Sequence, residues 1–595
     1  MKLFKFNPVF YVVFAAFLLC ACSKVEMTPG IYNGTAKGHN APLNVEVTVS
    51  EHAIEAISVK EHKETPGVST PAFKNVLQAI LDNQSVDVDA VSGATVTSNA
   101  LIEAVTKALE QTGADMSFFT KSVERKVKGK KIKKTADVVV IGAGGAGCAA
   151  AVQAHQCGAS VIIIDKMAAM GGNTILAGGI QNAVKDGSAQ AIANNDSQEK
   201  FFQQTISGGD YQGDTALVRI LTSQAWDALE WQESIGMKFG RTPSSVPGSL
   251  GNRGYGVQGG ANGYFVAYGK YFESNENIEL MLSTKALDLI EKNGRVVGVK
   301  CSDDAGNDIT LMANKGVVIA TGGFGQNVAM RQKYNEQWED LGESVKSTNS
   351  PAITGDGIVM AEKVGADLVQ MGNIQLLPHA DPETGRLGNI AGASGNGIFI
   401  NKEGNRFVNE AGRRDEMSHG TLAQTDGVMW IVVGGFRGFG PGFGGAGGFG
   451  GGDSENGDAS IIFHKTDNTI TAQTIEGLAE GMGVPVKNLK AAIADYNKRY
   501  LSTKPDKFGR DLFLSKIEPP YTAQLRKPAV HHTMGGLRID TDTHVLDKDG
   551  NAIPGLYAAG EVTGGIHGTN RLGGNALSEI VVFGRIAGRN AAGGK

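Results

Sequence analysis

The chain of 595 residues contains only five cysteines, and no two of them form a Cys-x-x-Cys pair. That spacing is what c-type haem attachment and iron–sulfur ligation use, so neither group is expected, nor is a metal site. The formal net charge is −5. Such a balance excludes a general nucleic-acid-binding surface, so no nucleic-acid partner is expected.

Long apolar runs are also scarce, and the one pronounced run lies at the N-terminus. Residues 1–22 are typical of an export signal, because two lysines precede an apolar stretch from Val9 to Leu19. The end of this segment, Leu19-Cys-Ala-Cys22, resembles a bacterial lipobox, which implies cleavage before Cys22 and a lipid on its thiol. We therefore expect an exported protein anchored to a bacterial membrane at its periplasmic or extracytoplasmic face. A plain signal peptide or an uncleaved anchor is the alternative.

A chain of this length should divide into domains. The predicted divisions are the lipoprotein signal peptide 1–22, a small α+β domain 28–115, a basic linker 116–134, a main α/β domain 135–373 and 520–595, and an inserted α+β domain 374–519. The linker contains six lysines between 126 and 134, and we expect it to be solvated, with attraction to anionic lipid as a secondary role. A glycine-rich insert at 434–452 lacks the Lys-Ser/Thr of a phosphate loop, which favours a flexible surface segment.

The small domain contains the sequence Asp89-Ala-Val-Ser-Gly-Ala-Thr95. This stretch matches the Asp-x-x-Ser-Gly-Ala-Thr signature on which FMN is esterified to threonine. The whole segment, with a predicted strand at 43–49 and helices at 71–81 and 99–111, resembles the FMN-binding domain of ion-pumping NADH dehydrogenase subunits. The resemblance implies one covalent FMN on Thr95, attached by an FMN transferase. The alternative is a turn that caps a helix.

The main domain opens with a glycine fingerprint, Gly142-x-Gly144-x-x-Gly147, which follows a predicted strand that begins at Ala136. These glycines permit a tight turn, let the backbone approach a pyrophosphate and let helix and strand pack closely. The next predicted strand ends at Asp165, the acid expected to bind the adenosine ribose. The order of strand, turn, helix, strand and acid predicts a Rossmann-like dinucleotide fold.

Further motifs resemble the loops that wrap flavin in the succinate dehydrogenase and fumarate reductase flavoprotein superfamily. The resemblance implies non-covalent FAD in the main domain and a clamp role for the inserted domain. Because no second dinucleotide fingerprint follows, direct NADH binding is not expected. The residues that we expect to bind FAD are Gly142, Ala143, Gly144, Gly147, Asp165, Lys166, Gly171, Gly172, Asn173, Thr174, Ala177, Gly178, Gly179, Thr321, Gly322, Asp356, Glu561, Asn575, Ala576 and Leu577.

The C-terminal motifs Val530-His-His-Thr-Met-Gly-Gly536 and Gly560-Glu-Val-Thr-Gly-Gly-Ile-His-Gly-Thr-Asn-Arg571 resemble flavocytochromes c and urocanate reductase. The resemblance implies that His531 and Arg571 bind a substrate carboxylate. It also implies that Arg414 is the catalytic proton donor, which protonates the α carbon after hydride transfer from FAD to the β carbon. Since the pKa of arginine exceeds about 12 in water, such a donor needs a closed, dry site. The alternative is that Arg414 solvates a helix end.

The chain departs from fumarate reductases at two places in the inserted domain. Leu376, Leu377 and Pro378 stand where those enzymes have a substrate histidine, and His379 is displaced, although we still expect it to contact substrate. The segment 389–394 supplies neither the glutamate nor the second arginine of the proton relay. These changes favour an apolar or heteroaromatic substrate tail over a second carboxylate.

The sequence therefore predicts a membrane-anchored two-flavin reductase of the C=C bond of a small α,β-unsaturated carboxylate, of the urocanate or arylacrylate type, in anaerobic respiration. Electrons would come from a membrane quinol dehydrogenase or cytochrome. Fumarate reductase is the first alternative, and an electron-carrying flavolipoprotein is the second. Arg414, His531 and Arg571 disfavour the second alternative and a steroid dehydrogenase, because neither needs a carboxylate clamp.

Overall fold

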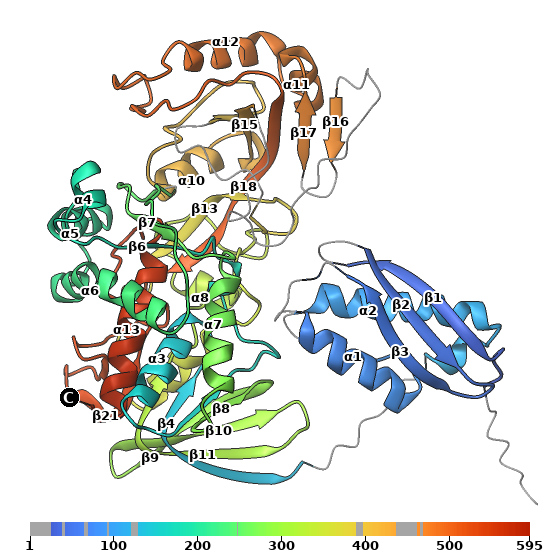
Figure 1. Ribbon diagram of the computed structural model, residues 1–595. Helices are drawn as coiled ribbons and strands as arrows, with labels where there is room; N and C mark the ends of the chain where they lie inside the picture. The colour runs from blue at the N-terminus through green and yellow to red at the C-terminus, as the bar shows by residue number, and fades with distance from the viewer. Residues whose placement is uncertain are drawn as a thin grey trace, which may run out of the picture. The chain divides into compact units, whose positions relative to one another are not determined.

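The computed structural model describes residues 25–38, 42–62, 64, 69–91, 94–120, 129–246, 248–387, 397–435, 461–464 and 468–594. The predicted signal peptide with Cys22, most of the glycine-rich insert and segment 389–394 lie outside these residues. Within these residues the chain forms two compact units (Figure 1): the smaller lies mostly within 25–120, and the larger mostly within 129–594. None of the helices described combines the length and apolar character needed to cross a bilayer.

The smaller unit is a three-stranded antiparallel sheet with two helices. Its elements are β1 (Gly30–Lys37), β2 (Pro42–Val49), β3 (Ile54–Glu61), α1 (Thr70–Asn83), α2 (Thr95–Leu109) and the short 3-10 turns η1 (Glu110–Thr112) and η2 (Met116–Phe118). The central strand β2 buries alternate residues, Leu43, Val45, Val47 and Val49, as a sheet with one covered face requires. A Cβ at Gly34 in β1 would lie 1.8 Å from the carbonyl oxygen of Ala104, so α2 packs directly on this sheet.

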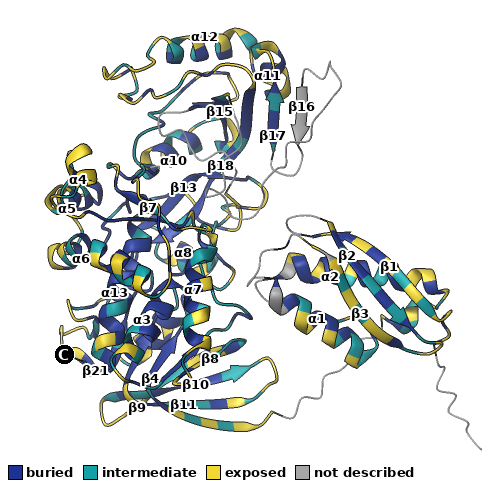
Figure 2. Ribbon diagram, viewed as in Figure 1, coloured by how far each residue is buried: buried dark blue, intermediate teal, exposed yellow. Residues whose placement is uncertain are grey.

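The larger unit is built on a mainly parallel sheet with the strand order β20-β21-β11-β4-β5-β8, to which β10 and β9 add beside β11. The strands are β4 (Lys131–Ile141), β5 (Val161–Ile164), β8 (Ile278–Met281), β9 (Thr284–Lys292), β10 (Arg295–Asp303), β11 (Asp308–Ile319), β20 (His544–Leu546) and β21 (Ala552–Ala558). The last four residues of β4 and of β11 and all of β5 are buried, and Figure 2 shows the region around α3 and α13 mostly in the colour of buried residues. Strands covered on both faces form continuous apolar runs, which explains Val161 to Ile164.

Two helices lie side by side against this sheet (Figure 1), α3 (Gly145–Gln156) and α13 (Asn575–Ala591). Their close approach depends on Gly588, where a Cβ would lie 2.1 Å from the carbonyl oxygen of Ala150. The remaining elements of this part are η3 (Thr174–Leu176), β6 (Ile180–Asn182), α4 (Ala189–Ala193), α5 (Gln198–Gly208), α6 (Thr215–Ser234), β7 (Gly254–Gly256), α7 (Asn262–Glu273), α8 (Val328–Lys333), α9 (Asp356–Lys363), β12 (Leu368–Val369) and β19 (Gly536–Leu537).

A second sheet has the strand order β14-β15-β18-β17-β16, and β13 pairs with the far half of β18. Its elements are β13 (Ile374–Ala380), β14 (Gly397–Ile400), α10 (Arg414–Leu422), η4 (Thr425–Gly427), β15 (Met429–Gly434), β16 (Ile461–His464), β17 (Thr469–Ala472), α11 (Ile475–Met482), α12 (Val486–Asn497) and β18 (Tyr521–Thr533). It has an apolar core of its own, which includes Ile398, Leu478 and Phe513.

The segment that leads into α10 is held by buried ion pairs. Arg406 binds Glu410 over 2.7 Å and Asp506 over 2.9 Å, and Arg510 binds the same glutamate over 2.9 Å. Charges buried in this way must be paired, and removal of one partner would leave another uncompensated. The network therefore fixes the loop that delivers Arg414 to the first position of α10.

The structure moves two predicted domain boundaries. Strand β4 starts at Lys131, so the last four residues of the predicted linker belong to the sheet, where they pair with Asp308 to Leu311 of β11. Their lysines are typical of a linker, but they occur here in a strand whose two faces are both partly exposed. At the other boundary, β18 starts at Tyr521, and its first half pairs with β15 and β17. The second sheet thus continues beyond residue 519.

Candidate functional site

A cavity of about 340 Å3 opens at the carboxyl ends of β4, β5, β11 and β21. Ile141, Ile164, Ala320 and Ala559 mark these strand ends on its wall. Ligands of open parallel sheets bind at this edge, because the loops that follow the strands converge there. The same cavity extends to β13, α10 and β18, which contribute the histidines and arginines described below.

The glycine fingerprint shapes the first wall of the cavity. Gly142 adopts a φ of +107°, and a Cβ there would lie 2.3 Å from the carbonyl oxygen of Ala320. Gly147 lets α3 approach, since a Cβ would lie 1.8 Å from the carbonyl oxygen of Gly142. At Gly144 the nearest atom to an added Cβ is 3.9 Å away, so its side toward the cavity is open. Backbone N–H groups at the start of α3 therefore face a space that suits a phosphate.

The acid at the end of β5 organises the fingerprint loop. Asp165 accepts hydrogen bonds from the backbone N–H of Ala143 over 2.7 Å and of Met167 over 2.8 Å. Burial raises the pKa of Asp165 despite these bonds. Its neighbour Lys166 binds Asp356, the first residue of α9, over 2.8 Å. Both residues of this ion pair line the cavity.

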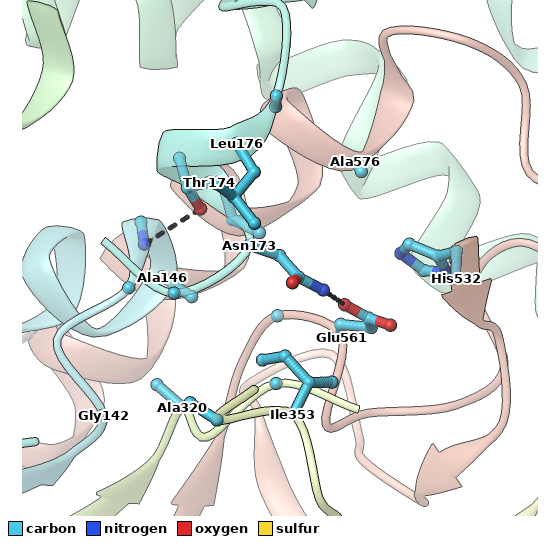
Figure 3. A pocket seen from close by; sticks show the side chains of 18 of the residues that line it. Gly142, Ala146, Asn173, Thr174, Leu176, Ala320, Ile353, His532, Glu561 and Ala576 are labelled. Carbon is cyan, nitrogen blue, oxygen red and sulfur yellow. Dashed lines mark hydrogen bonds between the residues drawn. The ribbon is translucent and has the colours of Figure 1, made fainter. Parts of the chain in front are cut away.

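A buried carboxylate lies deeper in the cavity (Figure 3). Glu561 accepts hydrogen bonds from Asn173 Nδ2 over 3.0 Å and from the backbone N–H of Thr533 over 3.0 Å. Burial raises the pKa of Glu561. Asn173 is held in turn, because its Oδ1 accepts from the backbone N–H of Ser350 over 2.8 Å. These hydrogen bonds fix the four segments that carry Asn173, Ser350, Thr533 and Glu561 relative to one another.

Two guanidinium groups, Arg414 and Arg571, line the far end of the cavity. Arg414 Nη1 and Arg571 Nη2 each donate to Oε1 of Gln375 over 3.3 Å. Burial, and then the charge of Arg571, lower the pKa of Arg414 well below its usual range. Burial likewise lowers the pKa of Arg571 to about 10. Two cations on one neutral acceptor make this end of the cavity a strong attractor for an anion.

Four histidines surround the arginines. His531, His532 and His379 line the cavity, and the ring of His567 lies edge-on to that of His532, with 5.5 Å between their centroids. His531 Nδ1 is hydrogen-bonded to Thr348 Oγ1 over 2.7 Å. Burial and the nearby arginines lower the pKa of every one of these rings, to about 3 for His379 and His567. The histidines are therefore neutral near pH 7, and the guanidiniums carry the positive charge.

Apolar side chains complete the far end. Leu377 of β13, Leu387 and Val246 line the cavity near the same group of residues. Leu377 is 5% exposed, whereas its neighbour Leu376 is fully buried and does not reach the cavity. The side of the site contributed by β13 thus offers a hydrocarbon surface and the neutral ring of His379.

The structure brings most of the predicted site residues to one place. Arg414, His531, Arg571 and His379 line the cavity together with Gly142, Gly144, Asp165, Lys166, Gly172, Asn173, Thr174, Ala177, Gly178, Thr321, Gly322, Asp356, Glu561, Ala576 and Leu577.

Five predicted FAD residues are not among those that line the cavity: Ala143, Gly147, Gly171, Gly179 and Asn575. Ala143 binds Asp165, as described above. Gly171 and Gly179 adopt φ values of +151° and +74°, which glycine alone adopts without strain. Asn575 accepts a hydrogen bond from Asn182 over 2.7 Å. Direct contact of these five residues with FAD stays a prediction.

Sequence reasoning missed Gln375, His532, Thr348 and Leu387. Gln375 and Leu387 carry no recognisable motif, and His532 was visible only as the second histidine of the Val530 to Gly536 motif. Thr95 is the first residue of α2, so the predicted FMN attachment point stands at a helix N-terminus. Such a position favours a phosphate.

The residues on the cavity wall fit FAD. The glycine turn offers N–H groups to a pyrophosphate. Thr321 Oγ1 is buried with no hydrogen-bond partner among the described residues, so it can bind a polar atom of the ligand. Within those residues, no group of three or more histidine, cysteine, aspartate or glutamate side chains could hold a metal ion.

Comparisons with known protein families match the two units separately. The FAD binding domain family matches residues 137–577, and the FMN-binding domain family matches residues 38–110. The chain is 36% identical to a urocanate reductase of Eggerthella lenta, over 94% of this chain and 92% of that protein. It is also 36% identical to an NADH:acrylate oxidoreductase of Vibrio harveyi, over 96% of this chain but 62% of that protein. The chain thus spans about six-tenths of the length of the second relative.

Among solved structures, the open conformation of a flavocytochrome c3 fumarate reductase superposes with a TM-score of 0.61 at 32% identity. The superposition covers 80% of this chain and 83% of that one. The similarity therefore extends over most of the larger unit.

Proposed function

Because the chain belongs to the FAD-binding flavoprotein family of urocanate and fumarate reductases and also contains an FMN-binding domain, we propose that it reduces the C=C bond of an α,β-unsaturated carboxylate. The substrate is of the urocanate or arylacrylate type, and the reaction serves anaerobic respiration. In this proposal the parallel sheet is the Rossmann-like FAD domain, and the second sheet is the clamp that covers the substrate.

The observation that carries the proposal is the meeting of Arg414 and Arg571 in the FAD cavity. Among the described residues Arg571 has no ion pair with a carboxylate, and Glu561 and Glu579 only partly offset the lowering of its pKa by burial. A guanidinium fork binds a carboxylate through two parallel hydrogen bonds. An electron carrier that only relays electrons has no use for such a pair, which weighs against the flavolipoprotein alternative.

The roles of the residues follow from their positions. Bound FAD supplies the hydride that adds to the β carbon. Arg571 and His531 hold the substrate carboxylate, and Gln375 keeps both guanidiniums turned to the same side. Arg414 then delivers a proton to the α carbon. Burial makes Arg414 a better acid by lowering its pKa, and a clamp closed over bound substrate would exclude the water that competes for the proton.

The wall beside Arg414 favours a substrate with one carboxylate. Leu377 and Leu387 offer no hydrogen bond, and His379 stays neutral because its pKa is lowered to about 3. A second carboxylate without a charged partner would cost on the order of several kcal/mol when buried. At about 1.4 kcal/mol per tenfold, kcat/KM should favour urocanate or a cinnamate over fumarate by about a hundredfold or more.

Fumarate reduction is the second candidate, because two buried guanidiniums can each receive one carboxylate. The two candidates separate in one experiment. The purified holoenzyme, reduced with dithionite or methyl viologen, is mixed with fumarate, urocanate, cinnamates, acrylates and itaconate, and reoxidation is followed. Reoxidation by none of them would refute the enzyme proposal. The variant Arg414→Ala should retain FAD yet lose turnover of the best substrate, because it lacks the proton donor.

The FMN unit and the N-terminus complete the proposal. FMN esterified to Thr95 by an FMN transferase passes electrons to FAD, and a membrane quinol dehydrogenase or cytochrome supplies them. A lipid on Cys22 keeps the protein at the membrane, at the periplasmic or extracytoplasmic face. The variant Cys22→Ser should be released from membranes without a change in turnover with a soluble donor. Continued association that resists salt washing would refute the lipid anchor.

A further inference from the structure

Arg413, the residue directly before the proposed proton donor, forms a two-sided ion pair. Its Nη1 and Nη2 donate to the two carboxylate oxygens of Asp210 over 2.6 and 2.8 Å. Its Nε and Nη2 donate to the oxygens of Asp415 over 3.0 and 2.7 Å. Both contacts have the fork geometry in which guanidinium and carboxylate bind most strongly. Arg413 thus ties the first turn of α10 to a loop of the FAD-binding part of the chain.

Asp210 is fixed to the segment that carries Arg571. Its Oδ2 accepts a hydrogen bond from the hydroxyl of Thr569, two residues before that arginine. The backbones also lie in contact, because the N–H of Thr569 donates to the carbonyl of Gly209 over 3.2 Å. A Cβ at Gly209 would lie 2.4 Å from the carbonyl oxygen of His567. Asp210 therefore connects the segment that positions Arg571 with the helix that positions Arg414.

The backbone of this loop is held in a conformation that L-residues seldom adopt. Asp210 and the next residue, Tyr211, have φ values of +54° and +59°. Two successive non-glycine residues in the left-handed region persist only where surrounding contacts determine the conformation. Tyr211 is 74% exposed and contributes no packing that would explain it. The N–H of Tyr211 donates to the carbonyl of Ile206 over 2.9 Å at the end of α5, and the contacts of Asp210 with Arg413 and Thr569 add to the stabilisation of this conformation.

We propose that Asp210 and Arg413 are positioning residues that hold Arg414 in register with Arg571 across the substrate cavity. Neither residue lines the cavity, so they act through the two arginines. The proposal rests on the proposed function, because register between a carboxylate ligand and a proton donor matters only if a substrate is protonated there. The hydrogen bonds of the pair lower the pKa of Asp210 and raise that of Arg413, so both remain charged near pH 7.

Asp210→Asn in the holoenzyme tests the proposal. The amide keeps the shape of the side chain but loses the charge that binds the guanidinium. Because Arg571 still holds the carboxylate, KM should change less than about twofold, whereas kcat should fall about tenfold or more when the proton donor is misplaced. Slower proton delivery should also increase the solvent isotope effect on kcat. A purely structural role would lower the yield of holoenzyme and leave that isotope effect unchanged.

A matched control is Glu199→Gln on α5, which breaks the ion pair of Glu199 with Arg219 on α6, away from the cavity. It should leave kcat and the isotope effect unchanged. Arg413→Gln provides the second variant, and the double variant with Asp210→Asn completes a cycle. If the two residues act through one another, the double variant should be no slower than the slower single variant. Additive losses, or unchanged kcat in both single variants, would overturn the proposal.

Hydrogen exchange separates this inference from the proposed function. In Asp210→Asn, the amides in the first two turns of α10 should exchange faster, while those of α13 should not. This readout needs no substrate, so it stands even if the wild type reduces none of the acids in the screen. Unchanged exchange in α10 would refute the positioning role regardless of activity.

Discussion

Arg414 and Arg571 donate to the same atom, Oε1 of Gln375, each over 3.3 Å. Gln375 is fixed from its other end, because its Nε2 donates to Asn570 Oδ1 over 2.8 Å and to the carbonyl of Arg571 over 3.0 Å. The carboxamide therefore cannot turn without loss of several bonds. Because the carboxamide is neutral, it binds both guanidiniums without neutralising their positive charges. A substrate carboxylate can neutralise those charges.

Replacement of that neutral acceptor by a charged one should disable the site. Gln375→Glu introduces a carboxylate that binds both guanidiniums and competes with substrate, so KM should rise about tenfold or more. The same charge raises the pKa of Arg414 and makes it a poorer acid, so kcat should also fall. Steady-state kinetics of the holoenzyme measures both constants. Gln375→Met serves as the control, since it removes the acceptor without adding charge and should lower kcat with little rise in KM. Equal KM values in the two variants would contradict this account.

The parts of the fold that could be predicted are those with local signals. The glycine turn at Gly142, the strand that leads into Asp165 and the alternation from Leu43 to Val49 each depend on neighbours in sequence, and the structure has each of them. The start of β4 at Lys131 was missed, because the stabilising partner is β11, far away in sequence. A lysine-rich strand at a partly exposed position resembles a linker until that partner is known.

The FMN attachment point gives a prediction for the smaller unit. Thr95→Ala should remove a flavin that resists denaturation, because the hydroxyl that accepts the phosphate is absent. Turnover with an artificial donor to FAD should persist, while quinol-linked turnover should largely disappear. Flavin fluorescence of the denatured chain on a gel, after expression with the FMN transferase, reports the result. Thr97→Ala is a control on the same helix. A flavin that remains bound to Thr95→Ala after denaturation would show that the anchor lies elsewhere.

Glu579 on α13 provides a pH prediction. Its Oε1 accepts from the backbone N–H of Gly560 over 3.1 Å, its Oε2 has no partner among the described residues, and burial raises its pKa to about 8. Because the folded pKa lies above the usual 4.5, stability from this group is complete below about pH 4.5 and is lost as the pH rises toward 8.

Glu579→Gln mimics the protonated form at every pH. The variant should therefore exceed the wild type in stability by on the order of a few kcal/mol at pH 8, and the difference should vanish near pH 4.5. Denaturant unfolding of the holoenzyme at several pH values measures it. A difference that does not change with pH would refute the assignment.

The sequence predicts the site residues that belong to a recognisable motif. It does not predict those whose role depends on contact between two distant segments. Arg571 and His531 belong to recognisable sequence motifs. The role of Gln375 follows only from the structure, in which β13 lies between α10 and the C-terminal segment. The same holds for Asp210 and Arg413, which are 203 residues apart in the chain. Such pairs arise from tertiary packing, and no local periodicity or propensity encodes them.

Leu377 allows a test of substrate class on a single side chain. It lines the cavity within the run 376–378, where we expect fumarate reductases to carry a substrate histidine. Leu377→His should add a hydrogen-bond donor for a second carboxylate, and a hydrogen bond to a charged group contributes about 1.5–3 kcal/mol. The ratio of kcat/KM for fumarate to that for urocanate or a cinnamate should therefore rise about tenfold or more. Leu377→Ala is the control, because it creates similar space without a donor. If the alanine variant shifts the ratio equally, room rather than hydrogen bonding determines the preference. If the histidine variant leaves the ratio unchanged while fumarate is already the best substrate of the wild type, the argument from the apolar wall is wrong.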